Sequence, residues 1–215
     1  MKLWLKLVVQ VALVLGISSS HAGAYDDFFR AVALDDDTTV TALLQRGFDP
    51  NSRDDKGQSA LYLALRHGHD RVTEALLAHP QLALEQRNAA GETALMMAAL
   101  RGRRVWVERL LDKGAALAPA EGGWTALHYA ASGPDAATVA LLVQRGAPLD
   151  SRSPNGSTAL MMAAGYGPDA AVDLLLAAGA DRTLRNQRAL TAADFARGAG
   201  REALAQRLAP RPTGP

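Results

Sequence analysis

The chain has no cysteine among its 215 residues, so it forms no disulfide bond and carries no thiol for lipid attachment. Its charges are nearly balanced, with 23 Lys and Arg against 22 Asp and Glu, and no basic cluster would attract nucleic acid or an anionic membrane. The sequence also contains no nucleophile motif and no glycine-rich phosphate loop after a strand. These absences point away from enzymes and from nucleic-acid-binding proteins.

No apolar run is long enough to span a bilayer, for which about 20 residues are needed. The longest, Leu7–Ile17, follows Lys2 and Lys6 and precedes small residues, which is the pattern of a signal peptide over residues 1–24. We expect cleavage after Ala24, with cleavage after Ala22 as the alternative, and an uncleaved anchor is the other interpretation. Loss of both lysines changes the formal charge from +1 to −1. The richness in Ala, Arg and Leu suggests a bacterial source, so we expect a periplasmic protein.

A short motif recurs along the rest of the chain at intervals of 32 to 34 residues. It reads Thr-Ala-Leu, or a close variant, and begins at Ser59, Thr93, Thr125, Thr158 and Thr191. A glycine stands two residues before each of the first four copies, at Gly57, Gly91, Gly123 and Gly156. A fixed period in the thirties indicates one supersecondary unit stacked several times, and it favours binding over catalysis.

The unit from Asn88 to Pro119 shows what each repeat is expected to form. Gly91 predicts a tight turn, because glycine tolerates a positive φ. Thr93 is a helix N-cap residue, and the small helix formers after it predict a short inner helix that ends at Gly102. Arg104–Leu111 has apolar residues on one stripe and predicts an outer helix. A unit of this kind cannot bury its apolar faces alone, so we expect the units to stack.

These units resemble ankyrin repeats, whose pattern G-x-T-P-L-H-x-A-A is followed by V-x-x-L-L and G-A-D. The resemblance covers Asp26 to Leu208. It implies an all-α ankyrin-repeat solenoid of stacked helix–loop–helix units with short β-hairpin-like turns. The expected parts are an N-terminal cap at 25–54, repeats at 55–87, 88–119, 120–152 and 153–185, a C-terminal cap at 186–209 and a disordered tail at 210–215.

The units depart from the family pattern at two positions of the tetrapeptide. The proline is alanine in every unit, which keeps a good helix start. The histidine is present as His128 and is replaced by Tyr62, Met96 and Met161 in the other repeats. The hydrogen bonds that the family's histidine makes to neighbouring hairpins are therefore expected at His128 alone.

Three clusters have the residue types of a metal or redox site, and each has a structural interpretation. His69 in His67-Gly68-His69 occupies a family turn position, and no set of metal ligands surrounds the pair. Asp35–Asp37 precedes a predicted helix, where acidic residues complement the helix dipole. The Met96-Met97 and Met161-Met162 pairs are expected to fill gaps in the core. We expect no metal and no cofactor.

The resemblance also implies where a partner would bind, because the family uses its hairpin tips and the exposed side of its inner helices. Carried over by position, the partner-binding residues are Lys56, Gln58, Arg66, His67, Glu92, Arg101, Glu121, Trp124, Asn155 and Tyr166. Trp124 stands out, because a tryptophan directly after the hairpin glycine should not reach the helix core and exposed aromatic residues are enriched at interfaces. By contrast, Trp106 falls at a core position of an outer helix.

The sequence therefore predicts a non-enzymatic protein that binds a partner protein through the concave groove of its repeats. It resembles small exported, periplasmic ankyrin-repeat proteins of bacteria. We expect a monomer that binds no nucleic acid and, after signal cleavage, no membrane. Two alternatives stay open: a regulator or protector of a periplasmic enzyme, such as one handling oxidants, and a secreted effector directed at a host.

Overall fold

A computed structural model of the protein describes residues 23–118 and 123–209, and it divides the chain into two compact units. Unit 1 ends at Ala83 and unit 2 begins at Leu84. Helices and connecting loops make up the described residues, and their only β-pairing is an isolated bridge between Arg53 and Ser59. The predicted all-α repeat architecture is confirmed. The predicted signal peptide up to Ala22, residues 119–122 and the predicted tail at 210–215 lie outside the described residues.

Unit 1 contains, in its described part, a helix at residues 23–33 and three labelled helices. These are α2 (Asp37–Gln45), α3 (Ala60–His67) and α4 (Asp70–Ala78), and α4 packs against both α2 and α3. Phe28, Val40, Leu61 and Leu76 are fully or almost fully buried between them. Burial of such side chains is the main stabilising term of a small helical unit.

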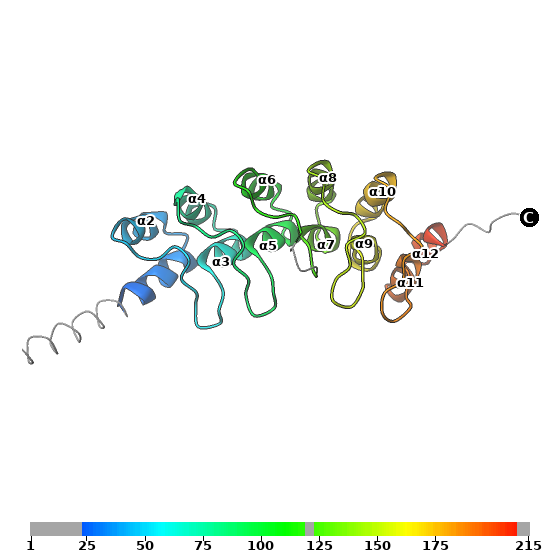
Figure 1. The fold of residues 1–215 in the computed structure, drawn as a ribbon, viewed down its shortest axis with the longest axis horizontal. Coiled ribbons are helices and arrows are strands. Elements are labelled where there is room, and N and C mark those ends of the chain that lie inside the picture. Colours follow the sequence, from blue (N-terminus) through cyan, green and yellow to red (C-terminus); the bar gives the residue numbers. More distant parts are fainter. Residues whose placement is uncertain (1–22, 119–122, 210–215) are drawn as a thin grey trace, which may run out of the picture. The chain divides into compact units, whose positions relative to one another are not determined.

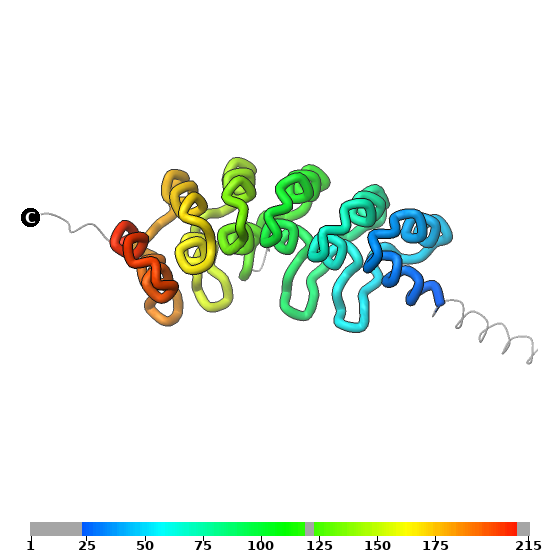
Figure 2. The backbone as a smooth tube through the Cα atoms, turned by 180° about the vertical axis from the view of Figure 1, so that it is seen from behind, coloured from blue at the N-terminus to red at the C-terminus, as the bar shows by residue number. Residues whose placement is uncertain are grey.

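Unit 2 contains two layers of short helices, which Figure 1 shows in sequence order and Figure 2 shows from behind. The inner helices are α5 (Ala94–Leu100), α7 (Ala126–Ser132), α9 (Ala159–Tyr166) and α11 (Ala192–Gly198). The outer helices are α6 (Arg104–Asp112), α8 (Ala136–Gln144), α10 (Asp169–Ala177) and α12 (Glu202–Leu208). Each inner helix packs against the next one, and α8 packs between α6 and α10. Trp106 is buried in α6, as the sequence predicts.

The repeated Thr or Ser starts each inner helix. Its side-chain oxygen accepts a hydrogen bond from the backbone N–H three residues later, at 3.3 to 3.4 Å, in Ser59, Thr93, Thr125, Thr158 and Thr191. This bond satisfies a donor that the helix itself leaves unpaired. In the same way, Asp36 caps α2 by accepting from the Thr39 backbone at 3.0 Å, so the capping interpretation of the acidic cluster is confirmed.

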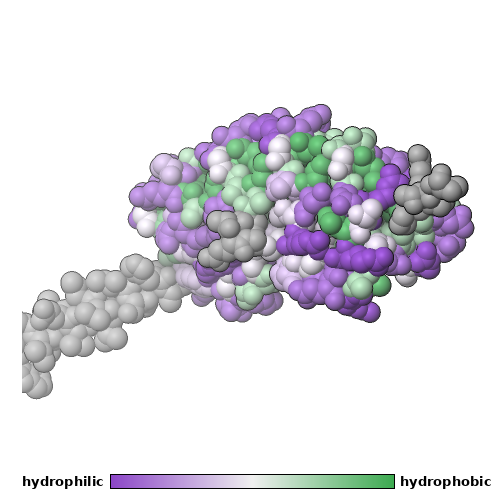
Figure 3. All heavy atoms as spheres, turned by 45° about the vertical axis from the view of Figure 1, so that its right-hand side comes forward, coloured by the Kyte–Doolittle hydropathy of each residue, from purple (hydrophilic) through white to green (hydrophobic). Residues whose placement is uncertain are grey.

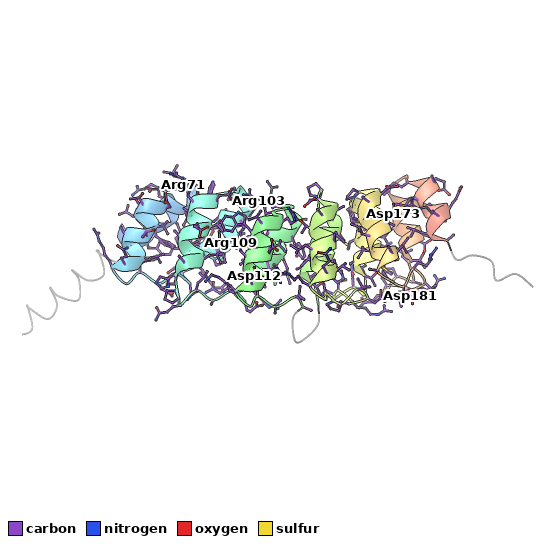
Figure 4. All side chains as sticks on the ribbon, turned by 90° about the horizontal axis from the view of Figure 1, so that it is seen from above. Arg71, Arg103, Arg109, Asp112, Asp173 and Asp181 are labelled. Atoms are coloured by element: carbon purple, nitrogen blue, oxygen red, sulfur yellow. The ribbon has the colours of Figure 1, made fainter. Side chains whose placement is uncertain are left out.

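Consecutive outer helices of unit 2 are joined by ion pairs on their solvent side. The Arg145 guanidinium donates to Asp112 at 2.7 Å and to Glu108 at 3.3 Å, and Arg207 donates to Asp173 at 2.7 Å. Figure 4 views these helices from above and labels Asp112 and Asp173. Because these side chains are between 34% and 59% exposed, solvent screens each pair and it contributes little stability, and the buried seam between the helices matters more.

One hairpin tip has a strained backbone that the sequence pattern does not predict. Gly57, Gly91 and Gly156 have φ values of 73°, 77° and 78° at the turn, and Ala189 stands at the equivalent place in the last unit with φ of 59°. Glycine adopts this region freely, whereas a Cβ is crowded there. Ala189 is exposed, so its replacement changes the backbone preference and little else.

Replacement of Ala189 with glycine is therefore expected to stabilise the protein by about 0.5–1 kcal/mol, because the strain at a positive φ is removed. The measurement is the urea midpoint at constant slope. Ala178→Gly is the matched control: Ala178 is also exposed and ends a helix, but its φ is −77°, so the same change should destabilise. An equal shift in both variants would contradict the strain at Ala189.

Candidate partner-binding surface

The residues predicted to bind a partner are distributed over both units. In unit 1, Lys56 and Gln58 lie at a hairpin tip, and Arg66 and His67 lie at the end of α3; all but the half-buried Gln58 are exposed. In unit 2 the described members are Glu92, Arg101, Trp124, Asn155 and Tyr166. Glu121 lies outside the described residues.

Trp124 borders a small cavity on the inner helices of unit 2. The cavity has a volume of about 190 Å³ and is lined by Leu100, Trp124, His128, Tyr129, Ser132 and Met162. These residues come from the end of α5, the hairpin before α7, α7 itself and α9. Three consecutive repeats therefore build one apolar site.

The indole of Trp124 is half-buried and stands edge-on to two rings of the following helix. Its centroid lies 5.4 Å from that of His128 at an interplanar angle of 82°, and 6.1 Å from that of Tyr129 at 77°. Edge-to-face contacts of this geometry are favourable for aromatic pairs. Trp124 is thus held against its own repeat rather than projecting freely, as a surface tryptophan would.

Tyr129 is oriented by a hydrogen-bond chain that crosses two repeats. Its hydroxyl donates to Glu92 Oε1 at 2.9 Å, and the Asn88 side-chain amide donates to Glu92 Oε2 at 2.8 Å. Glu92 was predicted to bind a partner, and in the structure its carboxylate is occupied in positioning Tyr129. Asn155 is similarly engaged, since its side-chain oxygen accepts from Ser153 Oγ and the Ser157 backbone within its own hairpin.

His128 forms the floor of the cavity and is 1% exposed. Its Nε2 donates to the Ser157 carbonyl of the next hairpin at 3.0 Å, and its Nδ1 accepts from the Thr125 backbone and hydroxyl at 3.2 and 2.8 Å. The predicted inter-hairpin bond of this histidine is present. Burial lowers the pKa of His128, because the charged imidazolium loses its hydration. The ring is therefore held neutral, with both nitrogens used by the fold.

Two exposed residues are close in the chain to residues that line the cavity. Tyr166 is 68% exposed and lies four residues after Met162 on α9, so both side chains project from the same side of that helix. Arg101 directly follows Leu100 at the end of α5. Its guanidinium makes no ion pair or hydrogen bond among the residues that the structure describes. We use the name inner-helix face for the surface made by Leu100, Arg101, Trp124, Tyr129, Met162 and Tyr166.

Sequence reasoning did not select Tyr129 or Met162 as site residues. Met161, Met96 and Met97 are buried, as the core interpretation requires, but Met162 is half-buried and lines the cavity. One signal that points to both residues is their place in the repeat, since each stands four positions after the capping threonine. Met97 holds the same place in the preceding repeat and is buried, so this place alone does not select site residues.

His69 has the structural role that the sequence favours. The His69 ring donates from Nδ1 to the Val32 carbonyl at 2.7 Å and stacks on His67 at 5.7 Å between centroids.

Among the described residues, no group of three or more metal-ligand side chains comes together. Within that same part of the chain, no helix has the length and apolar character of a membrane span. Figure 3 shows one face on which hydrophobic patches alternate with hydrophilic residues.

Comparison with known proteins defines the family. A family model described as ankyrin repeats (3 copies) matches residues 28–119 and 107–186, and the chain belongs to this family. Ankyrin repeats are generally non-enzymatic interaction modules, and the fold of this chain fits binding of a partner protein.

Similar proteins come from several sources. Over 104 residues the chain is 34% identical to a homolog of the transient receptor potential cation channel subfamily A member 1 from Caenorhabditis elegans, and over 121 residues it is 31% identical to Rabankyrin-5 from Mus musculus. These matches cover 48% and 55% of this chain but only 8% and 10% of those proteins, so the chain spans a small part of their length.

Two solved structures are similar over most of their length. The ankyrin repeat domain of Bcl-3, described as a unique member of the IkappaB family, is 32% identical with a TM-score of 0.64, covering 82% of this chain and 79% of that one. A structure of a predatory endopeptidase from Bdellovibrio bacteriovorus in complex with an immunity protein contains a chain that is 30% identical with a TM-score of 0.70. That match covers 85% of this chain and 96% of that one.

Proposed function

We propose that this protein binds a partner protein in the bacterial periplasm through the inner-helix face of unit 2. The observation that carries this proposal is the apolar cavity beside Trp124, whose walls come from three repeats and are held in place by hydrogen bonds within the fold. A surface that is ordered before binding loses little conformational entropy on association. Aromatic side chains around a small hollow are also typical of the residues that contribute most to binding energy.

Export is the second part of the proposal. Its support is the sequence of residues 1–24, with two lysines, the mostly apolar eleven-residue stretch Leu7–Ile17 and the small-residue pattern Ala22-Gly23-Ala24. The expected mature protein begins at Tyr25, and cleavage after Ala22 would make it begin at Gly23. N-terminal sequencing of protein from the periplasmic fraction distinguishes these outcomes and would reveal an uncleaved segment.

Site-specific photocrosslinking tests the binding face in living cells. Tyr166 and Val105 are both large apolar residues and are 68% and 61% exposed, but Tyr166 lies on an inner helix and Val105 on outer helix α6. A photoreactive amino acid at position 166 is expected to capture one protein reproducibly, whereas the same group at position 105 should not. Capture of the same protein from both positions, or from neither, would rule out the inner-helix face.

A more specific function is inhibition of, or immunity against, a periplasmic peptidase. It is favoured by the similarity, over 85% of this chain, to a chain from the endopeptidase–immunity protein complex. It also corresponds to the enzyme regulator that the sequence left open as an alternative. Under this proposal, the protein captured at position 166 is a peptidase, and its rate of peptide hydrolysis falls when the purified protein is added in equimolar amount.

A further inference from the structure

We propose that the cavity beside Trp124 takes up the phenyl ring of a phenylalanine on the partner protein, with a partner carboxylate placed next to Arg101. This inference rests on the proposed binding function and adds the chemistry that the partner must present. It is based on the size of the cavity, on the hydrogen bonds of its polar atoms and on the charge of Arg101, which directly follows the lining residue Leu100.

The volume of the cavity matches one aromatic ring. A closed apolar cavity of about 150 Å³ is large enough to hold benzene, whereas pockets for drug-sized molecules measure about 300–1,000 Å³. The cavity in unit 2 has about 190 Å³. It therefore has room for a single ring and not for a larger cofactor or metabolite.

The walls favour an apolar and aromatic occupant. The polar atoms of His128 are bonded to Thr125 and Ser157, the Tyr129 hydroxyl to Glu92, and the Ser132 hydroxyl to the His128 carbonyl at 3.0 Å. No lining group of α7 is thus left in need of a polar ligand, so a polar occupant would lose hydration without compensation. An aromatic ring gains edge contacts with the indole and a sulfur contact with Met162 in addition to burial.

The edge of the cavity favours a polypeptide as the source of that ring. The indole N–H of Trp124 makes no hydrogen bond among the described residues, so it is able to donate to a carbonyl of a bound main chain. The guanidinium of Arg101 is exposed and unpaired in that same part of the chain, so it is available for a carboxylate. The partner is therefore expected to present an acidic residue close to the phenylalanine.

A second copy of this chain cannot supply the ring. The sequence contains four phenylalanines, and Phe28, Phe29, Phe48 and Phe195 all lie within the described residues. Phe28 is buried and the other three are half-buried, so none is exposed for insertion into a neighbouring molecule. The cavity is better suited to a different protein.

The test uses a phage library of random twelve-residue peptides selected on the purified protein. Enriched peptides are expected to share a phenylalanine with Asp or Glu within a few positions. A synthetic peptide from the enriched set should bind at least 30-fold more weakly after Phe→Ala and several-fold more weakly after Asp→Asn, as measured by calorimetry. No enrichment, or a shared sequence without phenylalanine, would overturn the inference.

Variants of the protein test whether the phenyl ring of the peptide binds in the cavity. Ser132→Met fills the cavity from a half-exposed helix position and should weaken peptide binding at least tenfold. Val105→Met adds the same side chain to outer helix α6 and should leave peptide binding unchanged. Arg101→Glu should weaken binding more than Arg104→Glu, which makes the same charge change at the start of α6. Thermal midpoints of the four variants show whether the fold is retained, and Trp124→Phe serves as a milder second probe.

The two proposals fail in different ways. If the peptide binds the Ser132→Met variant with unchanged affinity, the inferred phenyl site is wrong. The proposed binding of a partner protein still stands in that case, provided that crosslinking at position 166 succeeds. The inferred phenyl site is also wrong if the captured partner binds the Ser132→Met variant as tightly as it binds the original protein. If position 166 captures nothing in cells, the proposed function itself fails.

Discussion

Replacement of Gly167 with alanine is expected to destabilise the protein by about 3 kcal/mol, at the upper end of the effect of overpacking a core position. A Cβ at this position would lie 2.0 Å from the Ala131 carbonyl oxygen and 3.2 Å from the Ala163 Cα. Both atoms belong to backbone, so neither can move aside as a side chain would. The end of α9 must therefore shift away from α7, which opens the seam between two repeats.

The measurement is the free energy of unfolding from urea titration followed by circular dichroism. Gly198→Ala is the control, because Gly198 is the last residue of α11 and a Cβ there meets no atom within 4 Å. That change should leave stability unchanged or raise it by up to about 1 kcal/mol, since alanine is the better helix former. A loss below about 1 kcal/mol for Gly167→Ala would show that the backbone contact is softer than the structure indicates.

Acidification is expected to weaken the fold through His128. Burial lowers the pKa of this imidazole in the folded protein, while the unfolded chain keeps the ordinary value of about 6.5. Below that pH the unfolded state binds the proton first, so stability is complete above about pH 6.5 and falls as the pH drops toward the folded pKa. One proton gives a slope of at most about 1.4 kcal/mol per pH unit.

His128→Leu separates this effect from other titrations. The variant starts from a lower stability, because Thr125 and the Ser157 carbonyl lose their partner, but its stability should change less between pH 6.5 and 5. The carboxylates of Asp36, Asp181 and Asp194 have pKa values lowered by hydrogen bonds, so their contribution is lost only at more acidic pH. Parallel pH profiles for the variant and the original protein would exclude His128 as the source.

Local signals in the sequence predicted the helices correctly because they act within one repeat. Thr93 caps the helix that follows it, and Asp36 does the same for α2, through bonds that span three residues. The turn glycines have the positive φ that their position requires. His128 also makes the bond to the next hairpin that its place in the motif implies. Such features depend on neighbours close in sequence or, for His128, on a contact that the family motif implies.

The candidate site was harder to predict, because its parts are brought together from different repeats. Leu100, Trp124 and Met162 line one cavity, although Trp124 lies 24 positions after Leu100 in the chain and Met162 lies 38 positions after Trp124. Glu92 stands at a position where a partner could bind, yet its carboxylate is occupied by Tyr129 and Asn88. The spacing of the repeats specifies the backbone position from which a side chain projects. It does not specify which side chain of the next repeat that side chain contacts.

The sequence by itself determined the repeating unit, the order of its helices and their caps, since each depends on a few adjacent residues and on a period that is visible along the chain. Only the tertiary structure decided that Trp124 is half-buried, that Met162 faces a hollow and that Gly167 admits no side chain. The physical reason is that these properties arise where one repeat packs on another, and packing depends on the volumes and hydrogen bonds of both partners at once.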